Sequence, residues 1–331
     1  MAKVVITDFV TGDLDLERDV LGADVEVSAV GAASEEELEG RIEDADALMV
    51  YHFVRLTEHS ITRLKRCQLI VRCGVGFDNV DGAAAARRGI ALANVPDYGT
   101  EEVADSAIGH LLAMFRGINL LNSRLRRGRG EWSHEQAAPL GRVRGQVLGI
   151  VGLGRIGSAT ALRAKALGLR VLFYDPYLPD GVDKSLGVDR VESLEELLAN
   201  SDAVSLHCPG TEATHQMIGA AAIARMKRGS YLVNTARGSI VVPEAVLAAI
   251  ESGHLAGAAI DVLPVEPPQG DEALIQAWRD PSHPAHDRVI INPHAAFYSQ
   301  QGLDDMRIKG SQNCARVLRG ETPRNVVNDV V

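Results

Sequence analysis

The sequence feature that most constrains the fold is a glycine-rich turn set between an apolar run and an alanine-rich segment. Residues 147–151 are apolar and lead directly into the sequence GLGRIG at residues 152–157. An alanine-rich stretch follows, and a second apolar run at 171–174 ends on Asp175. A strand, a tight turn, a helix and a second strand in this order form a βαβ unit of about 30 residues. The spacing therefore predicts a parallel sheet with helices packed against it.

The three glycines and the acidic residue suit a dinucleotide. In such a turn Gly152 allows the sharp bend, Gly154 lets backbone N–H groups approach a pyrophosphate, and Gly157 lets the helix pack close to the strand. The helix N-terminus adds partial positive charge. Asp175 stands 18 positions after Gly157, where a carboxylate binds the ribose hydroxyls and repels a 2′-phosphate. These residues predict NAD rather than NADP, against the alternative of a glycine turn that binds nothing.

Composition narrows the class of protein. The chain has 331 residues, 46% hydrophobic and 24% charged, with a formal net charge of −10, as in a folded protein of about two domains. The acidic balance predicts no nucleic-acid partner, and the basic run at 124–129 has no interleaved aromatics for base stacking. Early acidic residues and the lack of an apolar run of about 20 residues predict no membrane helix. Four scattered cysteines predict reduced thiols, a cytoplasmic location and no metal site.

Short β-branched runs alternate with amphipathic segments along the whole chain. In the first hundred residues the expected strands are 4–7, 48–51, 69–72 and 90–93, with helical patterns at 34–42 and 60–66. A long helix is expected from an N-cap at Thr100 to about Leu121. Six more strands are expected at 147–151, 171–174, 203–207, 231–234, 258–261 and 289–292, and then a C-terminal helix at 302–319. This alternation predicts an α/β fold.

Three groups suited to proton and carboxylate chemistry follow the last three expected strands. They are Arg237, Glu266 and His294. Ligands bind beyond the carboxyl ends of the strands in an open parallel sheet, so the three side chains are expected in one cleft. Reduction of a ketone needs a proton donor, which His supplies near neutral pH, and arginine binds a carboxylate in bidentate fashion. Taken singly, each has a structural alternative: a solvated loop arginine, a turn glutamate and a packed histidine.

Longer motifs extend this pattern over nearly the whole chain. They are VRCGVGFDNVD at 71–81, NVP at 94–96, TEEVAD at 100–105, the glycine turn, FYDPY at 173–177, LVNTARG at 232–238 and PHAA at 293–296. On these motifs the sequence resembles the D-isomer-specific 2-hydroxyacid dehydrogenases. Within them it is most similar to the C-terminal-binding-protein branch, which contains co-repressors.

The resemblance implies an NAD(H)-dependent oxidoreductase that interconverts a 2-keto acid and a D-2-hydroxy acid by hydride transfer. It implies a flavodoxin-like substrate-binding domain, residues 1–99 plus 300–331, with a Rossmann NAD-binding domain, residues 100–299, inserted into it. It also implies a homodimer, with the region after the Thr100 helix at the interface. The alternative, taken from the co-repressor branch, is an NAD(H)-sensing scaffold that binds partner proteins with little turnover.

The resemblance also assigns roles to individual residues. Arg237 binds the substrate, His294 is the acid/base, and Glu266 supports its imidazole. The substrate is held by Val75 and Gly76 backbone amides and lined by Tyr51, Arg72, Phe297 and Met306. The cofactor lies against Thr100, Gly152, Gly154, Arg155, Ile156, Gly157, Asp175, Cys208, Pro209, Thr214, Ala236, Arg237, Asp261 and His294. Phe297 stands where the co-repressor branch has tryptophan, and an aromatic lining favours a 2-keto acid with an apolar or thioether side chain.

Overall fold

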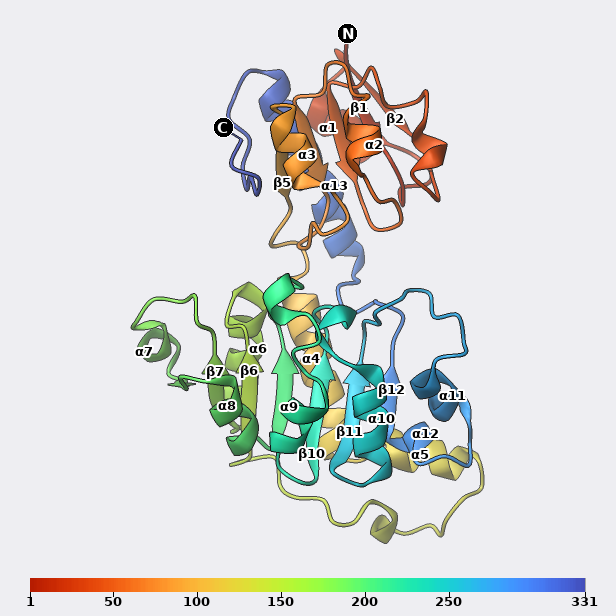
Figure 1. The fold of residues 1–331 in the computed structure, drawn as a ribbon, viewed down its shortest axis with the longest axis vertical. Helices are drawn as coiled ribbons and strands as arrows, with labels where there is room; N and C mark the ends of the chain where they lie inside the picture. Colours follow the sequence, from red (N-terminus) through yellow and green to blue (C-terminus); the bar gives the residue numbers. More distant parts are fainter. Residues whose placement is uncertain (331) are drawn as a thin grey trace. The chain divides into compact units, whose positions relative to one another are not determined.

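The computed structural model of the protein describes residues 1–330 and divides into two units (Figure 1). Unit 1 is Met1–Gly99 together with the segment from Ser299 onward, and unit 2 is Thr100–Tyr298. The structural boundary after Tyr298 and the sequence-based boundary after residue 299 differ by a single residue. The two ends of the described chain thus belong to one unit, and the other unit is a continuous stretch of sequence.

Unit 1 is built on a five-stranded parallel sheet. In chain order its elements are β1 (Ala2–Ile6), α1 (Asp15–Leu21), β2 (Val25–Ala29), η1 (Glu36–Leu38), β3 (Ala47–Val50), α2 (Glu58–Ile61), β4 (Leu69–Arg72), α3 (Gly82–Arg87), β5 (Ala91–Asn94) and α13 (Gln300–Leu318). The strand order β2-β1-β3-β4-β5 is that of flavodoxin-like folds, with the topological switch point between β1 and β3. The four strands expected from the sequence are present as β1, β3, β4 and β5, and β2 at the edge is an additional strand. Its partly exposed sequence VEVSA lacks a continuous apolar signal.

The segment at 34–42 is not the expected helix. It contains only the short 3-10 helix η1. Glu37 accepts a hydrogen bond from the N–H of Ala33 just before the segment, and Glu43 just after it accepts from the N–H groups of Gly40 and Ile42. Gly40 has a φ of 74°, a conformation that ends helices. The acidic spacing therefore serves local turns rather than a solvent-facing helix.

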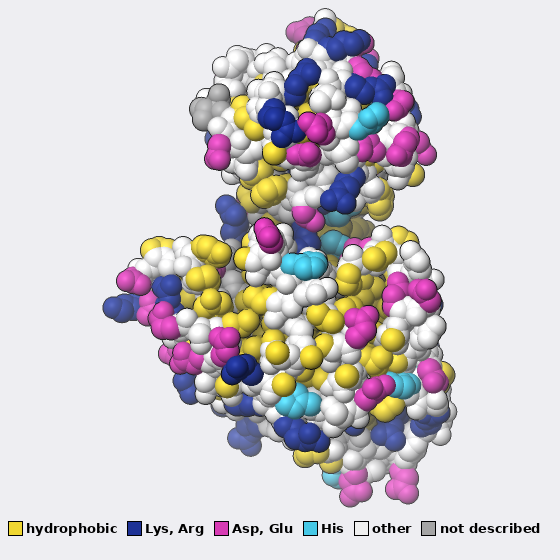
Figure 2. All heavy atoms as spheres, viewed as in Figure 1, with side chains coloured by type: hydrophobic (Ala, Val, Ile, Leu, Met, Phe, Trp, Pro, Cys, Tyr) yellow, Lys and Arg dark blue, Asp and Glu magenta, His cyan; other side chains and the backbone are white. Residues whose placement is uncertain are grey.

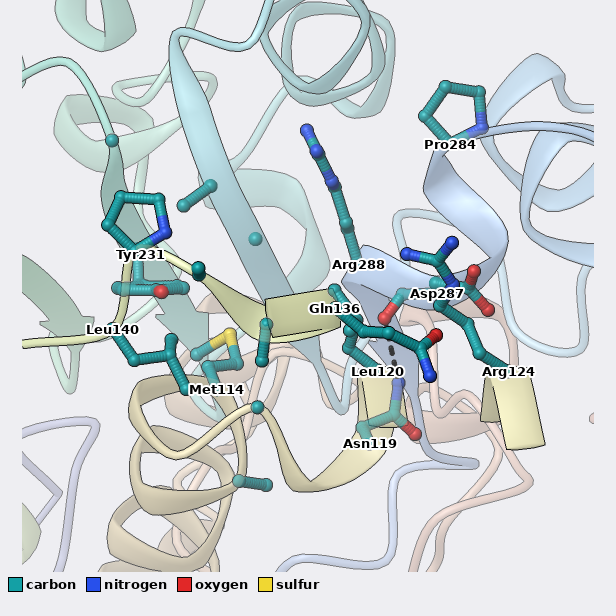
Figure 3. Close-up of a pocket in the computed structure, with 18 of the residues that line it drawn as sticks. Met114, Asn119, Leu120, Arg124, Gln136, Leu140, Tyr231, Pro284, Asp287 and Arg288 are labelled. Carbon is teal, nitrogen blue, oxygen red and sulfur yellow. Dashed lines mark hydrogen bonds between the residues drawn. The ribbon is translucent and has the colours of Figure 1, made fainter. Parts of the chain in front are cut away.

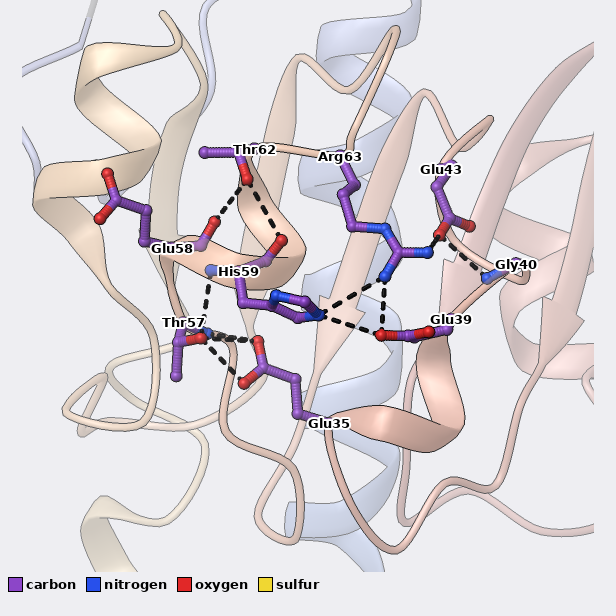
Figure 4. A network of polar contacts seen from close by, with 9 residues as sticks. All are labelled: Glu35, Glu39, Gly40, Glu43, Thr57, Glu58, His59, Thr62 and Arg63. Carbon is purple, nitrogen blue, oxygen red and sulfur yellow. Dashed lines mark hydrogen bonds and ion pairs between the residues drawn. The ribbon is translucent and has the colours of Figure 1, made fainter.

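A network of polar contacts fastens this segment to α2 (Figure 4). Glu35 Oε1 accepts from the N–H of Thr57 at 2.8 Å, and Glu39 Oε1 contacts His59 Nε2 at 3.0 Å and Arg63 at 2.7 Å. Burial pushes the pKa of Glu35 upward, but hydrogen bonds from Ser60 and Thr57 outweigh it and leave that pKa below its ordinary value. Hydrogen bonds from His59 and then Arg63 lower the pKa of Glu39. The expected helix at 60–66 is correspondingly shorter and earlier, as α2.

Unit 2 is built on a seven-stranded parallel sheet. In chain order its elements are α4 (Thr100–Phe115), α5 (Ile118–Arg126), η2 (His134–Ala137), β6 (Val147–Val151), α6 (Arg155–Ala166), β7 (Arg170–Tyr174), α7 (Val182–Leu186), β8 (Asp189–Arg190), α8 (Leu194–Asn200), β9 (Ala203–Leu206), η3 (Glu212–Thr214), α9 (Ala220–Arg225), β10 (Ser230–Asn234), η4 (Gly238–Ile240), α10 (Pro243–Glu251), β11 (Leu255–Ile260), α11 (Ala273–Arg279), α12 (Ala285–Arg288) and β12 (Val289–Ile291). The strand order β12-β11-β10-β9-β6-β7-β8 is that of a Rossmann fold with one added strand, and its switch point lies between β6 and β9. All six strands expected here are present, and β8 is an additional, two-residue strand.

Helices cover both faces of the unit 2 sheet (Figure 1). On one face, Ile108 and Phe115 of α4 and Ala161 of α6 pack against Leu148 and Val171 of the sheet. On the other face the packing helices are α8, α9 and α10, which contribute Leu198, Ile223 and Ile250 to the core. Because both faces are covered, the central strands β6, β9, β10 and β11 are mainly apolar, which is why they could be found in the sequence.

The long helix expected after residue 100 is two helices. Thr100 is the first residue of α4 rather than its N-cap, and α4 ends at Phe115. Gly117 has a φ of 61° and precedes α5, which continues to Arg126 and includes the first part of the basic run. A left-handed glycine here stops one helix and lets the next start in a new direction.

Surface and thiol features bear on the expected partners. On the face drawn in Figure 2, Lys and Arg are interspersed with Asp and Glu rather than gathered by sign. Within residues 1–330, no helix has the length and apolar character needed to cross a membrane, and no cluster of three or more His, Cys, Asp or Glu side chains is placed to hold a metal ion. Cys67, Cys73 and Cys314 are buried free thiols, and burial raises the pKa of Cys67 and of Cys73 to about 12.

Candidate active site

The glycine turn lies at the switch point of the unit 2 sheet, directly after β6. Gly152 has a φ of 87°, and a Cβ on it would lie 2.8 Å from the backbone nitrogen of Cys208. A Cβ on Gly157 would lie 2.1 Å from the carbonyl oxygen of Gly152. A side chain at either position would collide with backbone, so both must be glycine for the turn to close against the neighbouring loop.

The N-terminus of α6 is open to an anion. Gly154 is its N-cap and no side chain caps it. Apart from its neighbours in the chain, no described residue lies within 4 Å of where a Cβ on Gly154 would be. The first N–H groups of a helix, here those of Arg155, Ile156 and Gly157, have no intrahelical acceptor. Aligned peptide dipoles add partial positive charge at this end. The turn therefore fits the pyrophosphate of a dinucleotide.

The acidic residue after β7 is held by backbone groups on both sides. Asp175 Oδ2 accepts from the N–H of Leu153 in the glycine turn at 3.0 Å, and Oδ1 accepts from the N–H of Tyr177 at 3.1 Å. Arg190 of β8 donates to the Asp175 carbonyl at 3.2 Å. Arg190 was not among the residues expected from the sequence, because a lone arginine in a two-residue edge strand carries no motif.

The loop after β9 brings three of the expected cofactor residues together. Cys208 lies against the glycine turn and is partly exposed, and burial raises the pKa of its thiol to about 11. Thr214 Oγ1 donates to the carbonyl of Pro209 at 2.7 Å and accepts from the N–H of Thr211 at 2.8 Å. The Thr214 hydroxyl therefore closes this loop beside the turn.

His294 and Glu266 form a close pair beyond the carboxyl ends of β11 and β12. His294 Nδ1 lies 2.7 Å from Glu266 Oε2, and both side chains are about one-third exposed, at 30% and 34%. A carboxylate only accepts, so Nδ1 carries the hydrogen of this bond. Glu266 Oε1 is in turn held by the N–H of Leu263 at 2.7 Å. The ring of Phe297 meets the imidazole edge-on at a centroid distance of 6.1 Å.

Asp261 holds the backbone around His294. His294 has a φ of 52°, which is uncommon for a residue other than glycine. Its N–H donates to the Asp261 carbonyl at 2.8 Å, while the Asp261 carboxylate accepts from the N–H groups of Ala295 at 2.9 Å and Ala296 at 3.0 Å. The Asp261 residue is only 2% exposed. One buried carboxylate thus fixes the turn that presents the imidazole.

Asn234 has the same function for Arg237 at the end of β10. Its Nδ2 donates to the carbonyl of Arg237 at 2.9 Å, and its Oδ1 accepts from the N–H of Ala236 at 3.0 Å. Arg237 Nη1 donates to the Ala236 carbonyl at 2.8 Å. The three expected catalytic residues therefore all lie on loops beyond the carboxyl ends of adjacent strands of one sheet.

In unit 1, buried and partly buried polar side chains hold the loops that carry the expected substrate residues. Val75 accepts from Asn94 Nδ2 at 2.7 Å through its carbonyl, and Gly76 follows it in the loop after β4. Arg72 is 6% exposed and its Nε donates to Asn79 Oδ1 at 3.4 Å. Asn79 Nδ2 also donates to the carbonyl of Tyr51 at 3.0 Å. Neither asparagine was identified from the sequence as a loop anchor.

Tyr51 and Met306 are both fully buried in the structure. The Tyr51 ring stacks on Phe9 at a centroid distance of 5.4 Å, and burial raises the pKa of its hydroxyl well above the usual value. The side chain of Asp8, also fully buried, accepts from the N–H groups of Tyr51 at 2.8 Å and Phe53 at 2.6 Å. The expected pocket-lining role of Tyr51 and Met306 stays a prediction.

A cavity of about 490 Å³ lies at the opposite, amino-terminal edge of the unit 2 sheet (Figure 3). Met114, Tyr231 and Arg288 line it, and Asn119 beside it donates to the carbonyl of Asp287 at 3.2 Å. None of the site residues expected from the sequence is among its lining residues. The chemistry described above is therefore not located there.

Comparisons with known proteins agree with this geometry. Residues 108–296 match the NAD binding domain of the D-isomer specific 2-hydroxyacid dehydrogenases. The chain is 36% identical over 328 residues to D-3-phosphoglycerate dehydrogenase of Methanocaldococcus jannaschii, covering 99% of this chain and 60% of that protein. It is 38% identical over 292 residues to glyoxylate reductase of Korarchaeum cryptofilum, covering 88% of this chain and 85% of that protein.

A solved structure gives the same fold. D-lactate dehydrogenase from Aquifex aeolicus, complexed with NAD and lactic acid, superposes with a TM-score of 0.84 at 28% identity, covering 96% of each chain. The glycine turn, the helix N-terminus and the acidic residue of unit 2 fit the NAD that this family binds. The chain belongs to the D-isomer specific 2-hydroxyacid dehydrogenase family, with its NAD binding domain in residues 108–296.

Proposed function

We propose that this protein interconverts a 2-keto acid and the corresponding D-2-hydroxy acid with NAD(H). The observation that carries the proposal is the pair of His294 Nδ1 and Glu266 Oε2 at 2.7 Å. It lies beyond the carboxyl edge of the same sheet that presents the glycine turn. When bound, the nicotinamide supplies or takes up the hydride. The chain's own residues must then place the substrate and move one proton.

His294 is the proton donor for keto-acid reduction. Because Nδ1 donates to Glu266, Nε2 is the atom that exchanges the proton with the substrate oxygen. Glu266 stabilises the imidazolium and fixes the ring, and its own orientation comes from the N–H of Leu263. The reverse reaction uses the same atoms, with neutral His294 accepting the hydroxyl proton at Nε2.

Arg237 is the group that binds the substrate carboxylate. Its guanidinium offers parallel N–H donors that match a carboxylate, and it polarises the neighbouring keto oxygen. Asn234 Nδ2 holds the backbone carbonyl of Arg237, so the position of the Arg237 Cα is fixed. The expected contacts of Val75, Gly76 and Arg72 with the substrate stay predictions from the resemblance. Phe297, edge-on to His294, supports a substrate with an apolar or thioether side chain.

The proposal is tested by following NADH oxidation with a panel of 2-keto acids. The panel contains glyoxylate, hydroxypyruvate, pyruvate, phenylpyruvate and a methylthio-substituted keto acid. We expect turnover with at least one of them, and a product of D configuration by chiral chromatography. Absence of turnover above the enzyme-free rate with every member would overturn the proposed reaction. A product of L configuration would overturn the proposed stereochemistry.

The second candidate is an NAD(H)-sensing scaffold of the co-repressor type. The motifs that resemble the co-repressor branch are the reason to keep it, since that branch retains the same triad. None of the relatives named above is a co-repressor, so they give this alternative no support. Tight NADH binding with no turnover on the panel is the result that would favour it over catalysis.

We also propose a homodimer in the cytoplasm. The region after α4 exposes Ile118 at 58%, Leu125 at 38% and Trp132 at 91%, and large exposed apolar side chains mark association surfaces. Free, buried cysteines support a reducing compartment. Sedimentation equilibrium of the wild-type protein and of Trp132→Ala tests the dimer, and a monomer at micromolar wild-type concentration would contradict it.

A further inference from the structure

Arg190 is the main anchor of the loop that follows β7. Its Nη2 donates to the carbonyls of Asp175 at 3.2 Å and Leu178 at 3.0 Å, and its Nη1 donates to the carbonyl of Pro179 at 3.4 Å. The guanidinium also lies over the ring of Phe173 at 5.9 Å from the centroid. Its side chain is 19% exposed. One planar side chain therefore binds three carbonyls of a single short loop.

This loop has little else to hold its backbone. Among residues 175–180, the described structure has two short turns, at 176–177 and 180–181, and no backbone pairing with a strand or with another loop. Two of the six residues, Pro176 and Pro179, have no N–H to donate. The ion pair of Arg190 with Asp180 spans 3.6 Å, but the Asp180 side chain is fully exposed, so it contributes little. The Arg190 side chain is thus the group that ties the carbonyls at both ends of this loop to the sheet.

The same loop carries the carboxylate that faces the glycine turn. Asp175 is held from one side by the N–H of Leu153 and from its own loop by the N–H of Tyr177. Arg190 adds a third point through the Asp175 carbonyl. If the Arg190 contacts are lost, Asp175 keeps its bonds to Leu153 and Tyr177, but its carbonyl and the residues after it lose their tie to β8. The carboxylate is then held less firmly beside the turn, while it remains in the chain.

We propose that Arg190 is a positioning residue that sets the selectivity for NADH over NADPH. By holding the loop at 175–180 it keeps the Asp175 carboxylate where it binds the ribose hydroxyls and repels a 2′-phosphate. This inference rests on the cofactor site of the proposed function. The competing interpretation is that the Arg190 charge itself attracts a 2′-phosphate, and it makes the opposite prediction for NADPH.

The test measures the affinities of wild-type protein and four variants for NADH and for NADPH. Binding is monitored through the fluorescence of the nicotinamide. Arg190→Ala removes the anchor, and Arg190→Lys keeps the charge and part of the donor set. Asp175→Ala gives the selectivity that remains without the carboxylate. Arg170→Ala is the matched control, because Arg170 is on the neighbouring strand β7 but is 66% exposed and pairs only with the exposed Asp189 at 2.9 Å. Thermal unfolding of each variant reports on overall folding.

We expect Arg190→Ala to weaken NADH binding about tenfold. NADPH binding should stay the same or improve, so that the ratio of the two affinities falls towards that of Asp175→Ala. Arg190→Lys should recover part of the ratio, and Arg170→Ala should match wild type. In turnover with saturating keto acid and varied NADH, the KM for NADH should rise while kcat stays within about twofold, which a general loss of folding would not produce.

Two results would overturn the inference. The first is an affinity ratio for NADH over NADPH that does not change in folded Arg190→Ala or, if that variant does not fold, in Arg190→Lys; it excludes positioning by Arg190. The second is a selective loss of NADPH binding, which favours direct attraction of the 2′-phosphate by Arg190. Failure of the proposed reaction is separable from both. Wild-type protein that binds NADH but reduces no keto acid overturns the reaction and leaves the inference intact, whereas wild type that binds neither cofactor overturns the inference as well.

Discussion

The turn around His294 depends on one buried carboxylate, and Asp261→Asn tests how much catalysis relies on it. The substitution keeps the shape and removes the charge. An amide oxygen can accept from only one of the N–H groups of Ala295 and Ala296 that lie 2.9 and 3.0 Å from the carboxylate. The Asn NH₂ then faces the other N–H, and two donors meet.

The magnitude follows from these contacts. Hydrogen bonds to a charged group are worth about 1.5–3 kcal/mol each, and neutral ones about 1 kcal/mol. Losing one bond and reducing the other to a neutral one costs roughly 3 kcal/mol, which is about a hundredfold in the population of the turn. The positive φ of His294, 52°, opposes the native turn by about 1 kcal/mol or more. We therefore expect kcat with the best keto acid to fall between ten- and a hundredfold.

The assay compares kcat, NADH affinity by fluorescence and urea unfolding for wild type, Asp261→Asn and the control Asp280→Asn. Asp280 also accepts two hydrogen bonds in a loop of unit 2, from the N–H of Ser282 at 2.8 Å and its hydroxyl at 2.7 Å. Its carboxylate contacts Ser282, and the next residue, Pro281, accepts from Arg127 rather than from a site residue. The Asp280 variant should therefore keep wild-type kcat. A kcat within threefold of wild type in Asp261→Asn would refute the reasoning that this carboxylate positions His294.

Three further outcomes are expected. His294→Ala should lower turnover about a hundredfold or more, within the usual contribution of general acid–base catalysis, while NADH binding by fluorescence stays unchanged; nearly normal turnover would mean that another group donates the proton. Glu17 is fully buried, and its Oε1 lies 2.6 Å from Arg307 Nε. Glu17→Gln should therefore lower the free energy of unfolding in urea by about 3–5 kcal/mol. The control Arg18→Gln, which breaks an exposed ion pair, should lower it by less than about 1 kcal/mol. The pKa of Glu35 is lowered in the folded protein, so the unfolded state binds more protons at this group. The stabilisation from Glu35 is therefore complete above the unfolded pKa of about 4.3 and is lost as pH falls through the folded value. The free energy of unfolding, measured from pH 6 to 3, should decline less steeply in Glu35→Gln than in wild type, and identical slopes would contradict this.

Much of the fold follows from the sequence because the strands of both sheets are buried on two sides. Runs such as 147–151 and 231–233 are continuously apolar, and parallel order follows from the helices between them. The same logic predicts that Arg237, Glu266 and His294 lie at one edge of one sheet, since the carboxyl ends of parallel strands face the same way. What it cannot supply is the 2.7 Å pair, which depends on loop conformations set by Asp261 and Leu263.

The parts that sequence reasoning missed share a physical cause. The strand β8 is two charged residues, and Arg190 gains its importance from three carbonyls that no pattern marks. The segment at 34–42 has helical spacing, yet its glutamates find better partners in Thr57, His59 and Arg63. In each case a polar side chain is placed by a tertiary hydrogen bond, and such bonds override local propensity without leaving a periodic signal.

The continuity of unit 2 within a divided unit 1 determines the order in which the chain can acquire its structure during synthesis. All residues of unit 2 are present once Tyr298 has been added. At that point unit 1 still lacks α13, whose Arg307 pairs with the buried Glu17 of α1. It also lacks the segment after α13, in which Asn328 accepts a hydrogen bond from the N–H of Leu92 and Val326 forms a β-bridge with Ala93. The N-terminal sheet is therefore the last part to be completed, with its buried carboxylate unpaired until then. A ribosome-bound chain arrested after unit 2 would expose that sheet to proteases while its Rossmann domain resists them.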